Sequence, residues 1–188
     1  MTEKILGLQK DIVLLSPYRN EWTKLYEEEE KLLKEAAGSL IIDMQHVGST
    51  SVPGLVSKSI IDIAVTVKTL KEGEKCIEPF TVIGYEYKLD NVTEGILHHY
   101  FSKGGYHNRT HHIHVEEWNS KLWYNHILFR DYLRAHSDVM NEYAKLKIQL
   151  AEKFPLDRVS YRAGKDEFIE SIIEIAKKEL YKQSIFTF

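Results

Sequence analysis

The sequence predicts an α+β or mixed-sheet α/β fold, with helices packed on a sheet. The order of the expected elements is the first observation behind this prediction: one helix, then a set of strands, then three helices. The second observation is the Gly104-Gly105 pair between two expected strands, which is typical of a tight hairpin turn. Strands joined by such a turn are antiparallel, so we expect at least part of the sheet to be antiparallel.

The first helix is expected over residues 20–37, because apolar side chains such as Trp22 and Leu33 recur at helical spacing. Gly38-Ser39 ends this pattern. Four consecutive glutamates occupy positions 27–30 within the helix. Four successive residues point most of the way around a helix, so we expect this run to form a solvated acidic face.

Two apolar segments rich in Ile and Val follow, at residues 40–46 and 60–67, and both are expected to be strands. Between them lies the segment 48–54, which contains two glycines, three hydroxyl residues and a proline. This composition predicts a turn-rich loop. Thr69, with Glu72 three residues later, forms a capping box, which predicts that a short helix begins there.

The second half of the chain is expected to complete the sheet and then to become helical. Three further segments have the character of strands, at residues 83–88, 97–103 and 110–116. Beyond Asn119, apolar residues recur at helical spacing. No internal repeat or low-complexity linker divides the sequence, so residues 1–188 are expected to form a single domain.

Composition and charge indicate an ordinary globular protein. The 188 residues include 25 Lys or Arg and 28 Asp or Glu, which gives a net charge of −3, and 43% are hydrophobic. This balance does not predict an extended nucleic-acid surface. No apolar run reaches the roughly 18 residues of a membrane helix, and residues 1–15 lack the pattern of a secretion signal. The single cysteine, Cys76, suits a reducing compartment, so we expect a cytoplasmic protein that does not bind a membrane.

The segment from His46 to Asp62 is the most informative about chemistry. Its glycines let the backbone approach a ligand closely, and its amide and hydroxyl groups can bind an anion such as phosphate. The loop residues expected to take part are Gly48, Ser49, Thr50 and Ser51. The segment is neither a P-loop nor a dinucleotide-binding fingerprint, because the spacing of each is missing. The alternative is a tight connection between strands whose glycines serve only the turn.

Asp62 interrupts the otherwise apolar strand expected at residues 60–67. A carboxylate in such a strand is costly to bury without a partner or a cation. A strand carboxylate beside a phosphate-binding loop is a typical arrangement for Mg²⁺ held between the protein and a nucleotide. The alternative is a buried acid that bonds to the backbone or to a nearby lysine such as Lys58.

The same residues resemble a known family. Gly48-Ser49, followed after twelve residues by Asp62 in an apolar strand, is similar to the signature of the nucleotidyltransferase superfold. The longer segment from His46 to Asp62 resembles the GrpB-like family within that superfold. Further matches lie at residues 112–115, 129–134, 143–147 and 161–165. Together they extend the resemblance over residues 10–177.

The resemblance implies a nucleotidyltransferase-like mixed β-sheet with helices packed on it. In the superfold, the Gly-Ser loop holds a nucleoside triphosphate, and two carboxylates two residues apart on the following strand bind metal. Asp62 matches the first carboxylate, but Ala64 occupies the second position. Residues 62 and 64 share a strand face, and alanine cannot coordinate a metal, so this departure argues against two-metal catalysis of the superfold type.

Three histidines could compensate for the missing carboxylate. His112 and His114 are two residues apart on an expected strand, so both project from one face, and His46 ends the strand before the loop. If those strands are neighbours, the histidines could converge with Asp62 on a site for a divalent metal other than Mg²⁺, or for proton transfer on a phosphate. The alternative is a set of hydrogen bonds in a polar cleft without metal.

Basic residues are the remaining candidates for anion binding. Lys58 follows the loop, and Arg130 and Lys147 lie in the later helical region. Arg130 and Arg134 are four residues apart and share a helix face, and the guanidinium fork suits phosphate. The alternative is that these side chains are exposed, or that Arg130 forms a structural salt bridge with an aspartate.

These observations favour a single-domain protein that binds a nucleotide or another phosphorylated small molecule. The reaction expected from the resemblance is Mg²⁺-dependent nucleotidyl transfer, with Asp62, Ser49, His112 and His114 as candidate catalytic residues. One alternative is a non-catalytic binding module that keeps the fold without turnover, which Ala64 favours. Another is a metal-dependent phosphoesterase built on the histidines.

Overall fold

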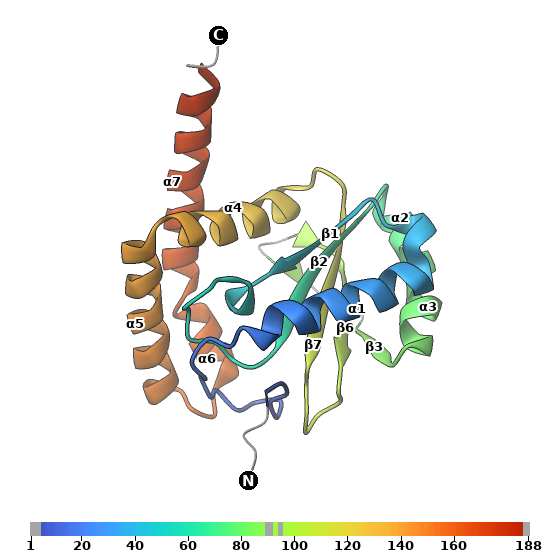
Figure 1. Ribbon diagram of the computed structural model, residues 1–188, viewed down its shortest axis with the longest axis horizontal. Coiled ribbons are helices and arrows are strands. Elements are labelled where there is room, and N and C mark those ends of the chain that lie inside the picture. The colour runs from blue at the N-terminus through green and yellow to red at the C-terminus, as the bar shows by residue number, and fades with distance from the viewer. Residues whose placement is uncertain (1–4, 89–91, 94–95, 186–188) are drawn as a thin grey trace.

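The computed structural model describes residues 5–88, 92–93 and 96–185 (Figure 1). Its centre is a five-stranded sheet in the order β1-β2-β7-β6-β3. In that order the strands are Asp43–Val47, Ile61–Val67, His111–Glu117, His99–Lys103 and Tyr85–Lys88. β4 (Val92–Thr93) and β5 (Ile96–Leu97) form a separate two-stranded sheet. Residues 1–4, part of the segment in which no secretion signal is expected, lie outside the described residues.

The main sheet is mixed, as the sequence predicts. β2 runs parallel to β7, and the other three neighbouring pairs are antiparallel. The parallel pairing places Asp62 beside His112 and Ala64 beside His114. Because side chains alternate between the two faces of a strand, these four residues lie on the same face of the sheet. The predicted α+β class, with helices packed on a mixed sheet, is confirmed.

Helices cover both faces of the sheet (Figure 1). They are α1 (Glu21–Ala37), α2 (Leu70–Gly73), α3 (Ile77–Val82), α4 (Lys121–Ala135), α5 (Ser137–Lys153), α6 (Arg158–Ala163) and α7 (Asp166–Ile185). α1 and α3 pack on one face, where Phe80 joins the main apolar core. α4 crosses the other face, and its Trp123 packs against Ala64. The capping box before α2 is confirmed, since the Thr69 hydroxyl accepts a hydrogen bond from the Glu72 N–H at 3.2 Å.

Two expectations for the second half of the chain were wrong. Gly104-Gly105 does not form a two-residue turn, because β6 and β7 are joined by residues 104–110. The strands are antiparallel, but the Asn108 carbonyl folds back to within 1.9 Å of the place where a Cβ of residue 104 would lie. In addition, four helices rather than three follow β7 within the described residues. The extra helix is α6, which Asp157 caps by accepting a hydrogen bond from the Ser160 N–H at 3.0 Å.

The amino-terminal segment, residues 5–16, bonds to parts of the chain that are distant in sequence. Ser16 and Ser57 exchange two backbone hydrogen bonds of 2.8 and 2.9 Å. The Val13 N–H donates to the Pro155 carbonyl at 2.9 Å, in the connection between α5 and α6. The segment therefore holds the end of the β1–β2 connection close to the start of α6. No helix in the described ranges is long and apolar enough to cross a bilayer.

Glu29 on α1 is buried, which corrects the expectation that the whole run 27–30 is solvated. Only 6% of its surface is exposed. Its carboxylate accepts hydrogen bonds from the Tyr85 hydroxyl at 3.0 Å and from Lys103 Nζ at 2.8 Å, and His111 Nε2 lies 3.8 Å from its second oxygen. A buried carboxylate requires partners of this kind. These contacts attach α1 to β3, β6 and β7.

We expect Glu29→Ala to lower the free energy of unfolding by about 3 kcal/mol, because Lys103 and Tyr85 would lose their shared acceptor at a buried site. The matched control is Glu28→Ala on the same helix. Glu28 is exposed, and its Oε1 lies 3.9 Å from Lys24 Nζ. Its loss should lower the free energy of unfolding by less than about 0.5 kcal/mol. Urea denaturation measures both values, and equal losses would contradict a buried attachment at Glu29.

Candidate functional site

Gly48 lies directly against Asp62. The Gly48 backbone has φ 68°, a left-handed conformation that favours glycine. A Cβ added to Gly48 would lie 2.6 Å from Asp62 Oδ2 and 2.9 Å from its Cβ, so only a residue without a side chain allows this approach. The Asp62 side chain is 30% exposed. The loop and the strand carboxylate therefore form one local site.

The loop is held in place by its own hydroxyl groups. Ser49–Ser51 forms a single 3₁₀ turn, in which the Ser51 hydroxyl donates to the Gly48 carbonyl at 2.6 Å. The Thr50 hydroxyl donates to the Ile60 carbonyl at 3.2 Å. Both side chains are buried. Thr50 and Ser51, expected to bind an anion, instead use their hydroxyls to hold the loop.

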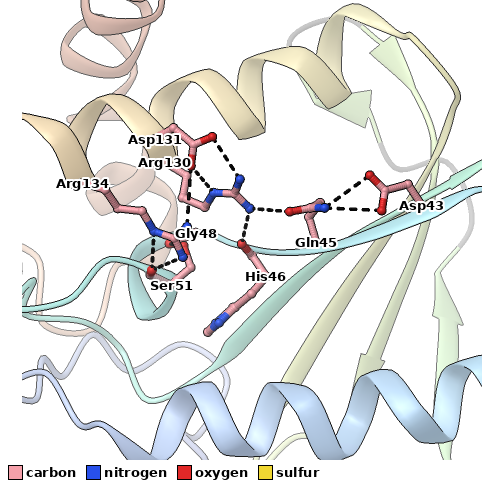
Figure 2. Close-up of polar contacts among 8 residues, drawn as sticks. All are labelled: Asp43, Gln45, His46, Gly48, Ser51, Arg130, Asp131 and Arg134. Atoms are coloured by element: carbon pink, nitrogen blue, oxygen red, sulfur yellow. Dashed lines mark hydrogen bonds and ion pairs between the residues drawn. The ribbon is translucent and has the colours of Figure 1, made fainter.

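Two arginines of α4 also hold this loop (Figure 2). Arg130 donates from one Nη to the Gln45 side chain at 2.8 Å and to the His46 carbonyl at 3.0 Å, and its Nε pairs with Asp131 at 2.7 Å. Arg134 donates to the Ser51 carbonyl at 2.7 Å. Arg130 is 8% exposed. Its guanidinium bonds to partners within the protein. Arg130 therefore forms the structural salt bridge with an aspartate that the sequence analysis gave as the alternative to anion binding.

Asp62 and His112 form a hydrogen-bonded pair. His112 Nδ1 lies 2.9 Å from Asp62 Oδ1, as the parallel register of β2 and β7 allows. Burial raises the pKa of Asp62, but the hydrogen bond from His112 and the charge of nearby cations such as Lys58 outweigh it and hold that pKa below its ordinary value. Burial also lowers the pKa of His112. At neutral pH the pair is therefore an ionised carboxylate and a neutral imidazole.

The second carboxylate position of the superfold is filled by hydrocarbon. Ala64 has no exposed surface, and it packs with Val47, Trp123 and Ile127. An acidic side chain at position 64 would be buried beneath α4 without a partner. Because Asp62 also gives one oxygen to His112, these residues do not fit the two-carboxylate metal arrangement of the superfold.

The histidines do not converge as expected. His46 pairs with Ile63 in the β1–β2 register, so it lies on the opposite face of the sheet from Asp62 and His112. There its Nε2 lies 3.0 Å from the Thr50 hydroxyl. His114 shares the face of Asp62, but its Nδ1 lies 3.1 Å from His98 Nε2. Among the residues that the structure describes, no group of three or more His, Cys, Asp or Glu is arranged to hold a metal ion.

A group of basic side chains lies around Asp62, and we call it the cationic cluster. Its members are Lys58, Lys147, Arg158, Arg162 and Lys165. Burial, followed by the charges of Arg158 and Lys165, lowers the pKa of Lys58 to about 7. Burial and Arg162 lower the pKa of Lys165 to about 8. Cations that depress one another in this way are short of compensating negative charge.

Lys147 is the most buried member of the cluster, with 2% of its surface exposed. Its Nζ donates to the Val56 carbonyl and lies 5.4 Å from the centre of the Tyr143 ring. Burial, followed by the charges of Lys165 and Lys58, holds its pKa well below the ordinary value. Lys147 therefore supports the backbone of the β1–β2 connection at Val56 and forms the buried part of the cluster.

Sequence reasoning missed the two arginines of the cluster. Arg158 and Arg162 are four residues apart on α6, a spacing that places both on one helix face. The same spacing was noticed on α4, at Arg130 and Arg134. Spacing alone does not distinguish an arginine pair that faces the loop from one that binds internal carbonyls.

The fold and the site together define a class of protein. The chain is an α+β protein with a mixed sheet, in which a Gly-Ser loop lies against a single strand carboxylate. Within this class, the chain belongs to the GrpB family, whose model, described as "GrpB protein", matches residues 12–175. The resemblance to the GrpB-like family is confirmed.

Several relatives support this assignment. The crystal structure of conserved protein GrpB from Enterococcus faecalis gives a TM-score of 0.81 at 34% identity, over 89% of this chain and 99% of that one. Glutamate-rich protein GrpB of Alkalihalophilus pseudofirmus is 38% identical over 90% of this chain and 98% of its own length. UPF0157 protein YqkA of Bacillus subtilis is 40% identical over 86% of this chain, which spans 46% of the length of YqkA.

We expect Gly48→Ala to lower the free energy of unfolding by more than its left-handed backbone conformation alone would cause. Gly54→Ala is the matched control, because Gly54 has φ 83° but its nearest contact is 3.7 Å away, at Met140 Cε. Each variant should lose about 1 kcal/mol from left-handed strain, and Gly48→Ala about 1–3 kcal/mol more from its clash with Asp62. Urea denaturation measures the difference, and equal losses would argue against the contact.

His46 should make the protein sensitive to acid. Burial lowers its pKa from 6.5 to about 3, so below pH 6.5 the unfolded chain binds a proton that the folded chain does not. Stability from this residue is therefore complete above pH 6.5 and is lost as pH falls toward 3, by about 2 kcal/mol between pH 7 and 5.

The test compares unfolding at pH 7 and pH 5 in the wild type and in His46→Gln, whose amide can still bond to Thr50. The variant should lose about 2 kcal/mol less than the wild type over this range. His107→Gln, at an exposed histidine, is the control and should match the wild type. The same acid response in His46→Gln and the wild type would contradict the assignment.

Proposed function

We propose that this protein binds a nucleoside triphosphate, or another small molecule with several phosphate groups, at the loop 48–51, Asp62 and the cationic cluster. The observation that carries this proposal is the charge imbalance around Lys58. Three cations, Arg158, Lys165 and Arg162, lower the pKa of Lys58, and the Asp62 carboxylate opposes them. A bound polyanion would relieve this repulsion.

The chemistry of the cluster favours phosphate over other anions. Arginine presents several donors in a planar fork that matches phosphate oxygens, and lysine adds a compact positive charge. Charge-assisted hydrogen bonds of this kind are the strong ones in proteins. Because Gly48 has no side chain, the loop backbone lies against Asp62, the carboxylate near Lys58.

Binding should take up protons at neutral pH. The pKa values of Lys58 and Lys165 are lowered to about 7 and about 8 by burial and by neighbouring cations. A phosphate anion beside these amines favours their charged form and raises both pKa values. The bound complex therefore holds more protons than the free protein.

The second candidate function is binding without catalysis, in contrast to binding that is followed by nucleotidyl transfer. The packing of Trp123 against Ala64 favours it, because the place of the superfold's second metal-binding carboxylate is filled by a side chain of α4. The resemblance implies Mg²⁺ in this superfold, but the residues at the site do not fit a metal pair, so we route no step of the proposed function through a metal.

Isothermal titration of ATP, GTP, CTP and UTP tests the proposal, with and without Mg²⁺. The double variant Arg158→Met/Arg162→Met removes two charges from α6 and keeps good helix formers. Each lost contact to phosphate is worth about 1.5–3 kcal/mol, so affinity should fall by at least about tenfold. Titration in two buffers of different ionisation enthalpy should detect the proton uptake.

The matched control is Lys71→Met/Lys75→Met, which removes the same charge from an exposed surface that does not belong to the cluster. It should bind like the wild type at moderate ionic strength. A wild-type protein that binds none of the four nucleotides would refute the proposal, and so would an α6 variant with wild-type affinity. Equal affinity in EDTA and in Mg²⁺ would show that the cluster alone neutralises the phosphates.

A further inference from the structure

His112 has one ring nitrogen that the folded protein leaves without a partner. The residue is 5% exposed. Its Nδ1 bonds to Asp62, while its Nε2 is buried and makes no hydrogen bond within the described part of the chain. A buried polar atom without a partner costs about 1–3 kcal/mol. Such a cost at a ligand-binding site indicates that a ligand atom provides the missing bond.

The Asp62 bond fixes which ring nitrogen carries the proton. An ionised carboxylate only accepts hydrogen bonds, so Nδ1 must be the donor across the 2.9 Å contact. In the neutral imidazole, Nε2 is then an unprotonated acceptor. Asp62 thus acts on His112 as a positioning residue, in the arrangement that a carboxylate adopts beside a histidine general base.

The surroundings of His112 keep Nε2 in this acceptor state. The Tyr100 ring packs beside the imidazole, with ring centroids 5.4 Å apart. Arg158 and Lys58 of the cationic cluster act on the same imidazole and disfavour a second proton. The histidine is therefore bonded to the carboxylate that orients it and lies within the electrostatic influence of cations proposed to hold phosphate.

The partner of Nε2 must be a hydrogen-bond donor, which excludes the phosphate oxygens themselves. Phosphate oxygens that carry charge are acceptors, and two acceptors cannot bond to each other. A hydroxyl group can donate to Nε2 while its oxygen faces a neighbouring phosphorus. The chemical class that satisfies both His112 and the cationic cluster is an alcohol bound next to a nucleotide phosphate.

We propose that His112 Nε2 is the proton acceptor for the hydroxyl group of a second, alcohol-type substrate in nucleotidyl transfer. This proposal rests on the proposed function. As the hydroxyl oxygen bonds to the α-phosphorus, its proton passes to Nε2. The bond from that phosphorus to the bridging oxygen breaks, and pyrophosphate leaves with its electron pair, toward the lysines and arginines. Asp62 stabilises the resulting imidazolium, which later returns its proton to water.

Nitrogen NMR of protein labelled with ¹⁵N-histidine tests the tautomer without any substrate. We expect His112 to show a protonated Nδ1 and an unprotonated Nε2 at pH 7, and Asp62→Asn to lose this preference. His112→Asn identifies the resonances, and its amide can keep the bond to Asp62. His107→Gln is the control, since an exposed histidine should leave the His112 signals in place. A proton on Nε2 of the wild type would overturn the proposal.

The hydroxyl probe is glycerol, with D-ribose as a second probe, each added at saturating concentration together with ATP. The Nε2 resonance should move toward the protonated position when both ligands are present and should not move with ATP alone. Absence of this movement with either alcohol would overturn the assignment of a hydroxyl substrate. Circular dichroism of each variant confirms that it is folded.

Transfer of label from [α-³²P]ATP to the two alcohols gives the kinetic readout. His112→Asn should lower transfer by at least about 100-fold, as expected for removal of a general base, while ATP affinity stays within about threefold. Unchanged transfer in this variant would overturn the proposal. Titration of ATP on the same samples separates the proposed function from the proposed role of His112. Failure to bind ATP refutes the proposed function. The tautomer of His112 tests the role of the Asp62–His112 pair independently of ATP binding.

Discussion

The close contact of Gly48 with Asp62 is the constraint on which the rest of the site depends. No side chain fits between them, since even a Cβ would lie 2.6 Å from the carboxylate. The loop reaches this position because Arg130 and Arg134 hold its ends to α4, and because its own hydroxyls bond to its carbonyls. Once the carboxylate is fixed beside the loop, the parallel pairing of β2 and β7 brings His112 to its other side. The arginines and hydroxyl groups that hold the loop thus also set the geometry of Asp62 and His112.

Local patterns in the sequence predicted much of the fold and the centre of the site. Composition and periodicity located the strands around residues 48–54 and singled out Asp62, and the resemblance identified the family. Long-range partners could not be predicted, because a pattern tells which residues share a face and not what covers that face. Glu29 therefore looked like one more exposed glutamate, although Lys103, far along the chain, pairs with it. His46 was similarly expected to share a site with His112, but the β1–β2 register places the two histidines on opposite faces of the sheet.

The packing at Ala64 leaves no room for a second carboxylate beside Asp62. In the superfold, the second carboxylate points from this strand position toward bound metal. Here the same face is covered by Trp123, which is itself only 4% exposed. Restoring an acid at position 64 would require α4 to move, because a tightly packed interior does not accept an unpaired charge. Positive side chains of α6 and of residue 165 lie near Asp62 and Lys58 instead. The candidate site thus combines residues from elements that are distant in sequence, the loop, β2, β7 and α6.

The hydrogen bond from Val13 to Pro155 has a consequence for how the protein is made. A ribosome delivers residue 13 first and residue 155 more than a hundred residues later, at about 5–20 residues per second. Val13 is therefore synthesised several seconds before Pro155, its hydrogen-bond partner. Contacts between such distant positions also slow folding, because a long loop has to close first. Residues 5–16 can therefore complete their contacts only in stages, first with Ser57 and later with Pro155.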